Sequence, residues 1–167
     1  MNRILTNEHS GEDSRITIRA LVITVSSTRD LESDASGSIM ADLISGIAKK
    51  TERKVISDSA GEITRMLSHP GDFNCIIFSG GTGPSRKDLT SATLRDACWK
   101  ELPGFGELFR ARSAGTAGIM AYLSDASMFI HEGRVIFAIP GSPSAQETAF
   151  QIIREIVFHA VREATKE

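Results

Sequence analysis

The sequence predicts an α/β fold of three layers (α/β/α), with helices on both faces of a mostly parallel sheet that has one antiparallel edge strand. Short apolar runs rich in β-branched residues alternate with amphipathic stretches of helical period, the order typical of parallel α/β sheets. Two further runs, residues 127–130 and 134–139, are separated only by His131-Glu132-Gly133. This spacing predicts a β-hairpin, and therefore an antiparallel strand at one edge.

Size and charge place the chain among single globular domains. It has 167 residues, of which 41% are hydrophobic and 24% charged, and these are ordinary values for a globular protein. Its formal net charge of −2 provides no general attraction to nucleic acid or to an anionic membrane, so we expect neither as a partner. Since no apolar run reaches about 18 residues, we also expect no membrane-spanning helix.

The two cysteines and the first residues bear on location. Cys75 and Cys98 form no Cys-x-x-Cys unit, and Cys75 lies in an apolar run, so we expect two reduced thiols and a cytoplasmic protein. Residues 1–15 are polar and lack the apolar core of a signal peptide. We expect them to form a flexible N-terminal arm before one domain that spans residues 16–167.

The first predicted element is a core strand. Residues 16–25 are nearly continuous in apolar and β-branched side chains, as in a strand covered on both faces. Ser26 follows in a polar loop at the carboxyl end of this strand, where open α/β sheets bind ligands. It could donate a hydrogen bond to a ligand or simply cap the turn. Apolar residues at helical spacing then predict a helix over about residues 36–50.

Asp58 stands between the next two predicted elements. A short strand, residues 54–57, precedes it, and a helix, residues 62–68, follows it. By its residue type alone, Asp58 is expected to start a turn or to cap this helix.

The most informative stretch is residues 75–93. An apolar run, residues 75–78, predicts a buried strand, which stops abruptly at the glycine-rich loop Ser79-Gly80-Gly81-Thr82-Gly83. Glycines allow a tight turn and a close approach to a ligand, and the N–H groups of such a turn form a concave anion site. Arg86, Lys87 and Asp88 follow, and two cations with one carboxylate suit a phosphate bound together with Mg²⁺. The loop is neither a Walker A loop nor a dinucleotide fingerprint, because their Gly-Lys-Ser/Thr and third glycine are missing.

A second candidate region lies after a short helix that ends near residue 97. Residues 103–106 predict a loop, and a helix is expected over residues 107–113. Glu107 at its start either points into a pocket or stabilises the first turn through the helix dipole.

The last helix provides a second anion site. Pro143 suits its first position, and Ser144 with Glu147 fits a capping box. Gly141 and Ser142 lie just before this helix start, where free N–H groups and the positive end of the helix dipole favour an anion.

Three blocks resemble, in order, the motifs of the MogA/MoaB family of molybdenum-cofactor biosynthesis proteins. They are residues 79–90 (SGGTGPSRKDLT), 103–110 (PGFGELFR) and 139–145 (IPGSPSA). The resemblance, which covers about residues 16–160, implies the molybdopterin-binding fold and a molybdopterin adenylyltransferase. In that reaction the terminal phosphate of molybdopterin attacks the α-phosphorus of Mg-ATP. The products are adenylyl-molybdopterin and pyrophosphate, on the way to a molybdenum or tungsten cofactor.

The resemblance also implies roles for particular residues. Asp58 and Asp88 are the catalytic candidates and would bind Mg²⁺ or orient the attacking phosphate, and Glu107 would face the pocket. The predicted substrate- and nucleotide-binding residues are Ser26, Ser79, Gly80, Gly81, Thr82, Gly83, Lys87, Glu107, Gly141 and Ser142. Because related proteins form trimers or hexamers, we expect a homo-oligomer, with a downstream metal-insertion protein as a further partner.

Three departures from the family pattern keep a non-catalytic interpretation open. Lys87 stands where the family has arginine before the aspartate, and lysine lacks the bidentate fork of arginine. Residues 90–93 are one residue shorter than the family motif and lack its acid, and Asp125 stands where arginine is common. The alternative is a molybdopterin carrier that does not use ATP. A third interpretation is a structural subunit whose oligomer is its function.

Overall fold

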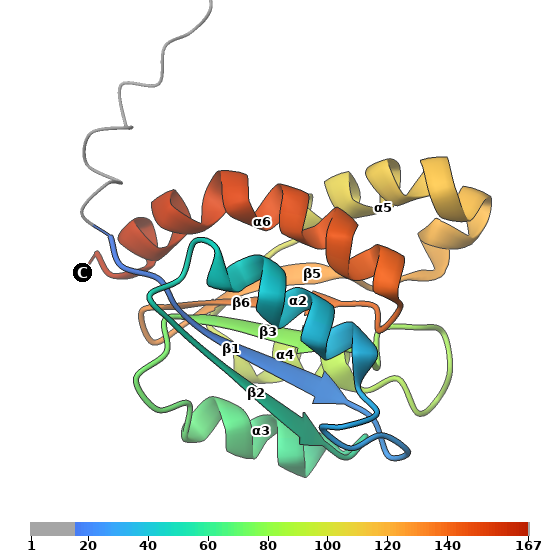
Figure 1. Ribbon diagram of the computed structural model, residues 1–167, viewed down its shortest axis with the longest axis horizontal. Coiled ribbons are helices and arrows are strands. Elements are labelled where there is room, and N and C mark those ends of the chain that lie inside the picture. Colours follow the sequence, from blue (N-terminus) through green and yellow to red (C-terminus); the bar gives the residue numbers. More distant parts are fainter. Residues whose placement is uncertain (1–15, 167) are drawn as a thin grey trace, which may run out of the picture.

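The computed structural model describes residues 16–166, so the predicted arm over residues 1–15 lies outside the described residues. One six-stranded sheet organises the chain, in the spatial order β2-β1-β3-β6-β5-β4 (Figure 1). The strands are β1 (Arg19–Val25), β2 (Lys50–Ile56), β3 (Cys75–Ser79), β4 (Lys100–Leu102), β5 (Ser127–His131) and β6 (Arg134–Ile139). The helices are α2 (Ala35–Ser45), α3 (Ala60–Ser68), α4 (Thr90–Ala97), α5 (Gly104–Ala117), the 3₁₀ helix η1 (Gly118–Leu123) and α6 (Pro143–Ala164).

Strand register brings several loops to one edge of the sheet. β2, β1, β3 and β6 are parallel, and Thr24, Ser79 and Ile139 lie level with one another at their carboxyl ends. β5 runs antiparallel to β6 and pairs Ser127 with Ala138, so the start of β5 lies at the same edge. The predicted α/β/α fold with a mostly parallel sheet is therefore confirmed. The loops after β1, β3 and β6, and the segment before β5, all meet at this carboxyl edge.

One strand was not predicted. β4 pairs antiparallel with β5 and forms the outer edge of the sheet beyond it. Its three residues, Lys-Glu-Leu, include one apolar side chain, too few to show the alternation by which strands are recognised.

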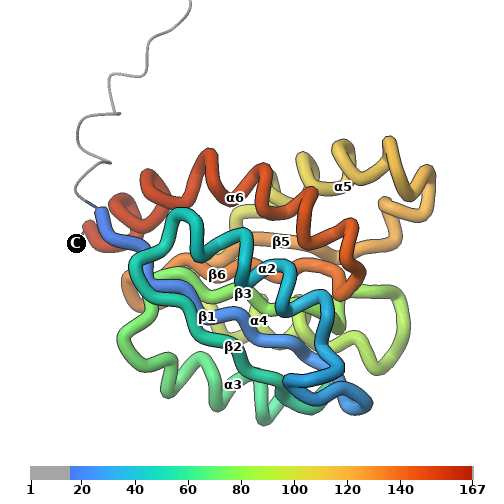
Figure 2. Tube along the Cα trace, in the orientation of Figure 1, coloured from blue at the N-terminus to red at the C-terminus, as the bar shows by residue number. Residues whose placement is uncertain are grey.

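Two apolar cores lie on the two faces of the sheet. On one face α2, α5 and α6 contribute Met40, Phe109 and Ile153, all almost completely buried. On the other face α3 and α4 contribute Ile63 and Leu94. Figures 1 and 2 show this layering, with α2 and α6 on one side of the strands and α3 on the other. Within the described residues, no helix is long and apolar enough to cross a membrane.

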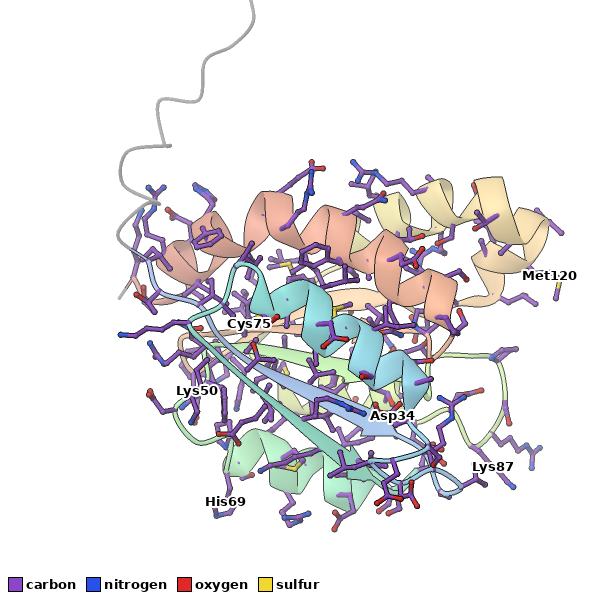
Figure 3. The ribbon with its side chains drawn as sticks, viewed as in Figure 1. Asp34, Lys50, His69, Cys75, Lys87 and Met120 are labelled. Carbon is purple, nitrogen blue, oxygen red and sulfur yellow. The ribbon has the colours of Figure 1, made fainter. Side chains whose placement is uncertain are left out.

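A buried carboxylate holds the β1 end of the site in place. Asp34, the N-cap of α2, is 2% exposed; it accepts hydrogen bonds from Gly37 N at 3.0 Å and from Thr24 Oγ1 at 2.7 Å. Arg53 on β2 completes the set, with Nη2 3.2 Å from Asp34 Oδ2. Asp34 thus joins β1, β2 and α2 just behind the carboxyl edge, and Figure 3 shows it at that end of the molecule.

Candidate functional site

The glycine-rich loop after β3 passes very close to its neighbours. Gly80 and Gly81 have φ angles of 103° and 66°, a region that side chains other than glycine rarely adopt. A Cβ atom on Gly80 would lie 2.6 Å from the carbonyl oxygen of Val25, and one on Gly81 would overlap the Thr90 hydroxyl. Both positions therefore require glycine for conformation and for space.

Three carbonyl groups of this loop, those of Gly80, Gly81 and Thr82, accept hydrogen bonds from the protein, whereas most of its N–H groups have no acceptor among residues 16–166. Thr90 donates from Oγ1 to Gly80 O at 2.8 Å and from N to Gly81 O at 2.9 Å, and Asp125 N donates to Thr82 O at 2.7 Å. Gly80 N donates to Ile139 O at 2.9 Å. Within residues 16–166, no acceptor takes the N–H of Gly81, Thr82 or Gly83. Three successive N–H groups with this freedom form the kind of concavity that binds anions.

Asp88 lies directly beside these N–H groups. Its Oδ2 accepts a hydrogen bond from Ser85 N at 2.9 Å, which folds the carboxylate back over the loop. A Cβ on Gly83 would be 2.8 Å from Asp88 Oδ2, so the carboxylate covers that glycine. Lys87 is exposed on the outer bend of the same loop (Figure 3).

A cavity of about 480 Å³ opens between this loop, α5, η1 and the start of α6. Six predicted residues line it, namely Gly81, Thr82, Gly83, Asp88, Gly141 and Ser142. Most of the remaining wall is apolar, and it includes Phe109, Met120 and Ala145. The cavity therefore combines an anion-binding loop with a surface suited to a flat apolar group.

A second, shallower hollow, also about 480 Å³, lies between the loop after β1 and the start of α6. It shares Gly81, Gly141 and Ser142 with the first cavity and adds Ser26 and Arg29. The guanidinium Nη1 of Arg29 would be 4.0 Å from a Cβ on Gly141. Our sequence reasoning missed Arg29, although a cation in the polar loop after the first core strand was a recognisable signal.

The start of α6 is built by Ser142 rather than Ser144. Ser142 is the N-cap, its Oγ accepts from Ala145 N at 3.3 Å, and Pro143 occupies the first position as predicted. The predicted Ser144–Glu147 capping box is wrong, because the helix begins two residues before the position that it requires.

Ser79 also lines the second hollow but supports the loop with its side chain. It is completely buried, and its Oγ accepts from Gln146 Nε2 at 2.9 Å. The same Gln146 nitrogen donates to Pro140 O at 2.8 Å. This buried amide, which sequence reasoning missed, therefore connects the two loops that bound both cavities.

Asp58 and Glu107 do not line either cavity. Asp58 follows β2 and accepts two hydrogen bonds from Ser27, while Glu107 is exposed in the first turn of α5, where an acid favours the helix dipole. Among residues 16–166, no three His, Cys, Asp or Glu side chains form a group that could hold a metal ion.

A charge network behind the loop accounts for the anion at position 125. Arg95 Nε lies 2.8 Å from Glu101 Oε2, and Arg95 Nη2 lies 3.1 Å from Asp125 Oδ1. The hydrogen bonds that Arg95 donates, first to Glu101 and then to Asp125, raise the pKa of Arg95 above its ordinary value. The carboxylate of Asp125 is thus paired with Arg95, while its backbone N–H holds the loop at Thr82.

Comparison with known proteins identifies the family. The family model described as "Probable molybdopterin binding domain" matches residues 21–159. The chain belongs to this family. The chain is similar to "Molybdenum cofactor biosynthesis protein B" of Halalkalibacterium halodurans, with 33% identity over 96% of this chain and 98% of the relative. The "Probable molybdopterin adenylyltransferase" of Methanocaldococcus jannaschii is 36% identical over 85% of this chain and 91% of the relative.

Solved structures agree with the assignment to the MogA/MoaB group. The tungsten cofactor synthesizing protein MoaB from Pyrococcus furiosus superposes with a TM-score of 0.80 at 30% identity. The match covers 90% of this chain and 98% of the Pyrococcus furiosus chain. The chain therefore functions in molybdenum or tungsten cofactor biosynthesis.

Proposed function

We propose that the chain is a molybdopterin adenylyltransferase. The terminal phosphate of molybdopterin attacks the α-phosphorus of ATP, a new phosphoanhydride bond forms, and the bond from the α-phosphorus to the bridging oxygen breaks. Adenylyl-molybdopterin and pyrophosphate are the products. The observation that carries this proposal is the row of three free N–H groups at Gly81, Thr82 and Gly83, with the Asp88 carboxylate beside them, in one cavity.

The chain's own contribution to this transfer is positioning and charge stabilisation. The N–H groups of Gly81, Thr82 and Gly83 bind phosphate oxygens, and the start of α6 with Arg29 binds a second anionic group. Both substrates are polyanions, so holding their phosphates in line accounts for most of what such a catalyst must do. No covalent intermediate on the enzyme is needed.

The residues present fit an ATP-bound Mg²⁺ rather than a resident metal. Mg²⁺ is commonly held by one or two carboxylates together with substrate phosphates. Asp88 provides one carboxylate at the loop: Oδ2 is bound to Ser85 N, and no hydrogen bond within residues 16–166 engages Oδ1. Asp88 would therefore hold the ion, which would neutralise phosphate charge. We keep Asp58 as a predicted second acid, although it lies outside the cavity lining.

The position of Asp58 favours one alternative, a molybdopterin carrier that does not use ATP. A protein that only binds molybdopterin would also be expected to have Asp88 near the phosphates and Asp58 hydrogen-bonded to Ser27. Calorimetry with Mg-ATP and with molybdopterin separates the two functions. Binding of both supports the enzyme, and binding of molybdopterin alone supports the carrier.

The decisive experiment is adenylyl transfer by the wild-type chain and by Asp88→Asn. We expect release of pyrophosphate from wild type with both substrates, and no release from the variant with an unchanged unfolding midpoint. Unchanged turnover by Asp88→Asn would remove Asp88 from the reaction. Matched Asp96→Asn, an exposed acid on α4, should transfer at the wild-type rate.

We further infer a homo-oligomer, trimer or hexamer, located in the cytoplasm and handing its product to a metal-insertion protein. Four large apolar side chains of η1 are more than half exposed, which favours burial against another surface; they are Ile119, Met120, Tyr122 and Leu123. Sedimentation equilibrium measures the oligomeric state directly.

A further inference from the structure

Gln146, near the start of α6, donates from one side chain to two separate loops. Its side chain is completely buried, and Nε2 lies 2.9 Å from Ser79 Oγ and 2.8 Å from Pro140 O. A longer contact of 3.3 Å reaches Ser142 O. Oε1 of the same amide is buried and has no hydrogen-bond partner within residues 16–166. A buried acceptor without a donor destabilises a fold, so the position that Nε2 occupies calls for a reason.

The acceptors determine which way round this amide lies. Pro140 O and Ser142 O are backbone carbonyl oxygens, which can only accept, so the nitrogen of Gln146 must face them. Exchanging the two atoms of the amide would bring Oε1 against both carbonyls and would release the loop between β6 and α6. The orientation that leaves Oε1 unpaired is therefore the one that holds this loop.

The contact with Pro140 O fixes the direction of the peptide group between Pro140 and Gly141. The C=O and N–H of a trans peptide point in opposite directions, and the described residues contain no cis peptide. Because Pro140 O points inward to the buried Gln146 amide, the N–H of Gly141 points outward, on the side where Gly141 lines both cavities. Within residues 16–166, no acceptor takes this N–H. It is a fourth free donor at the site.

This fourth donor lies next to the glycine-rich loop. A Cβ atom on Gly141 would be 3.4 Å from Gly80 Cα, so the two backbones are in contact. Gly80 N donates to Ile139 O at 2.9 Å, and beyond this bond the two chains separate into their loops. Gln146 then joins the loops again through Ser79 and Pro140. An anion over the free N–H groups of residues 81–83 therefore has the N–H of Gly141 at the border of the same cavity.

We propose that Gln146 is a positioning residue, which holds the peptide group after Pro140 so that the N–H of Gly141 donates to a phosphate group of the bound substrate. Gln146 itself touches no substrate. The inference rests on the proposed function, which brings phosphate groups to this site. Without the Gln146 amide the peptide group can rotate, and a bound phosphate loses one of its donors.

Calorimetric titration with pyrophosphate tests this role in wild type and in Gln146→Met, which keeps the length of the side chain but cannot donate. We expect the variant to bind pyrophosphate about tenfold more weakly, the lower end of what a hydrogen bond to a charged group contributes. Gln151→Met, at an exposed position of the same helix, is the matched control. Ile153→Val, at a buried position of α6, should lower the unfolding midpoint. Both control variants should bind pyrophosphate as wild type does.

The amide signal of Gly141 in a ¹H–¹⁵N spectrum separates positioning from a general loss of stability. Pyrophosphate should shift this signal in wild type and in both control variants, and much less in Gln146→Met. A merely structural role would lower the unfolding midpoint and leave the response of Gly141 unchanged.

Three results would overturn the role. If Gln146→Met binds pyrophosphate as tightly as wild type, or if Ile153→Val weakens binding equally, Gln146 does not position the donor, and the proposed function stands. If Gln146→Met does not fold, the wild-type spectrum decides, because binding that leaves the Gly141 signal in place contradicts the role. If wild type binds no pyrophosphate, the role and the phosphate site of the proposed function are both refuted.

Discussion

The Asp58 carboxylate is bound to Ser27 by two hydrogen bonds: its Oδ2 accepts from Ser27 N and from Ser27 Oγ, each at 2.8 Å. Asp58 N in turn donates to Ser27 Oγ at 3.2 Å. The acid at the end of β2 thus holds the loop after β1, which contributes Ser26 and Arg29 to the second hollow. This relationship gives Asp58 a way to affect the site without touching a substrate.

If Asp58 acts through Ser27, variants of the two residues should have the same kind of effect. We expect Asp58→Ala to raise KM for ATP about tenfold with kcat changed less than about threefold, since a shifted loop weakens binding. Ser27→Ala should raise KM less, because its N–H still reaches the carboxylate. Steady-state kinetics measures both. If Asp58→Ala instead lowered kcat while Ser27→Ala kept the wild-type kcat and KM, Asp58 would be a catalytic residue.

The glycine-rich loop should not tolerate a side chain at position 81. Gly81→Ala places a Cβ at a positive φ angle against Thr90, and we expect it to lower the free energy of unfolding by about 1–3 kcal/mol. Gly115→Ala is the control, because a Cβ there meets nothing within 4 Å and lies in a helix. Urea denaturation measures both variants. Equal stability of the two would show that the loop can relax away from Thr90.

The Arg95–Glu101 pair should make stability depend on acid pH. The hydrogen bond from Arg95 lowers the pKa of Glu101 below its ordinary 4.5. Because the folded protein has the lower pKa, the stabilisation is complete above about 4.5 and is lost as the pH falls through the folded value. Glu101→Gln should lower the free energy of unfolding by about 1 kcal/mol at pH 7, a small value because the ion pair is partly exposed. Below pH 4.5 the variant should lose less stability than wild type does.

The control for this pH dependence is Glu147→Gln. Glu147 is exposed on α6 and has no ion-pair partner within residues 16–166, so its replacement should leave the acid limb of the stability curve unchanged. Thermal unfolding from pH 3 to pH 7 compares the three proteins. Parallel curves for wild type and Glu101→Gln would mean that the pair contributes nothing to stability.

Both thiols should react slowly in the folded protein. Burial raises the pKa of Cys75 to about 12 and that of Cys98 to about 11. Because the thiolate is the reactive form, iodoacetamide at pH 8 should label the native chain far more slowly than the unfolded chain, and Cys98 before Cys75. Mass spectrometry follows each site. Fast labelling of native Cys75 would show that β3 opens readily.

The parts of the fold with strong periodic signals could be predicted, and the short or exposed parts could not. The buried strands and the start of α6 at Pro143 follow from continuous apolar runs and from proline geometry. β4 lacks such a signal. Trp99, between α4 and β4, is 70% exposed, and its ring lies edge-on to that of His131 with 5.5 Å between the ring centroids. An isolated aromatic residue next to an edge strand contains no information about which side it faces.

The site could be predicted only where one continuous stretch builds it. Residues 81–83 and Asp88 share a loop, and the sequence places them together. Gln146 joins the two loops of the site from α6, and its role depends on hydrogen bonds to Ser79 and Pro140 that exist only in the folded chain. Arg29 is an intermediate case. The strand before its loop was predicted, but the approach of the start of α6 to Arg29 was not.

The β5–β6 hairpin offers a place to attach a reporter. Its turn at Glu132 and Gly133 has two positive φ angles, 46° and 72°, and lies at the end of the sheet away from the cavities, because β5 begins and β6 ends at the carboxyl edge. A fluorophore or an affinity tag inserted there would be separated from the bound substrates by the full length of two strands. A protein immobilised through this turn would keep its two cavities, at the carboxyl edge of the sheet, facing the solution.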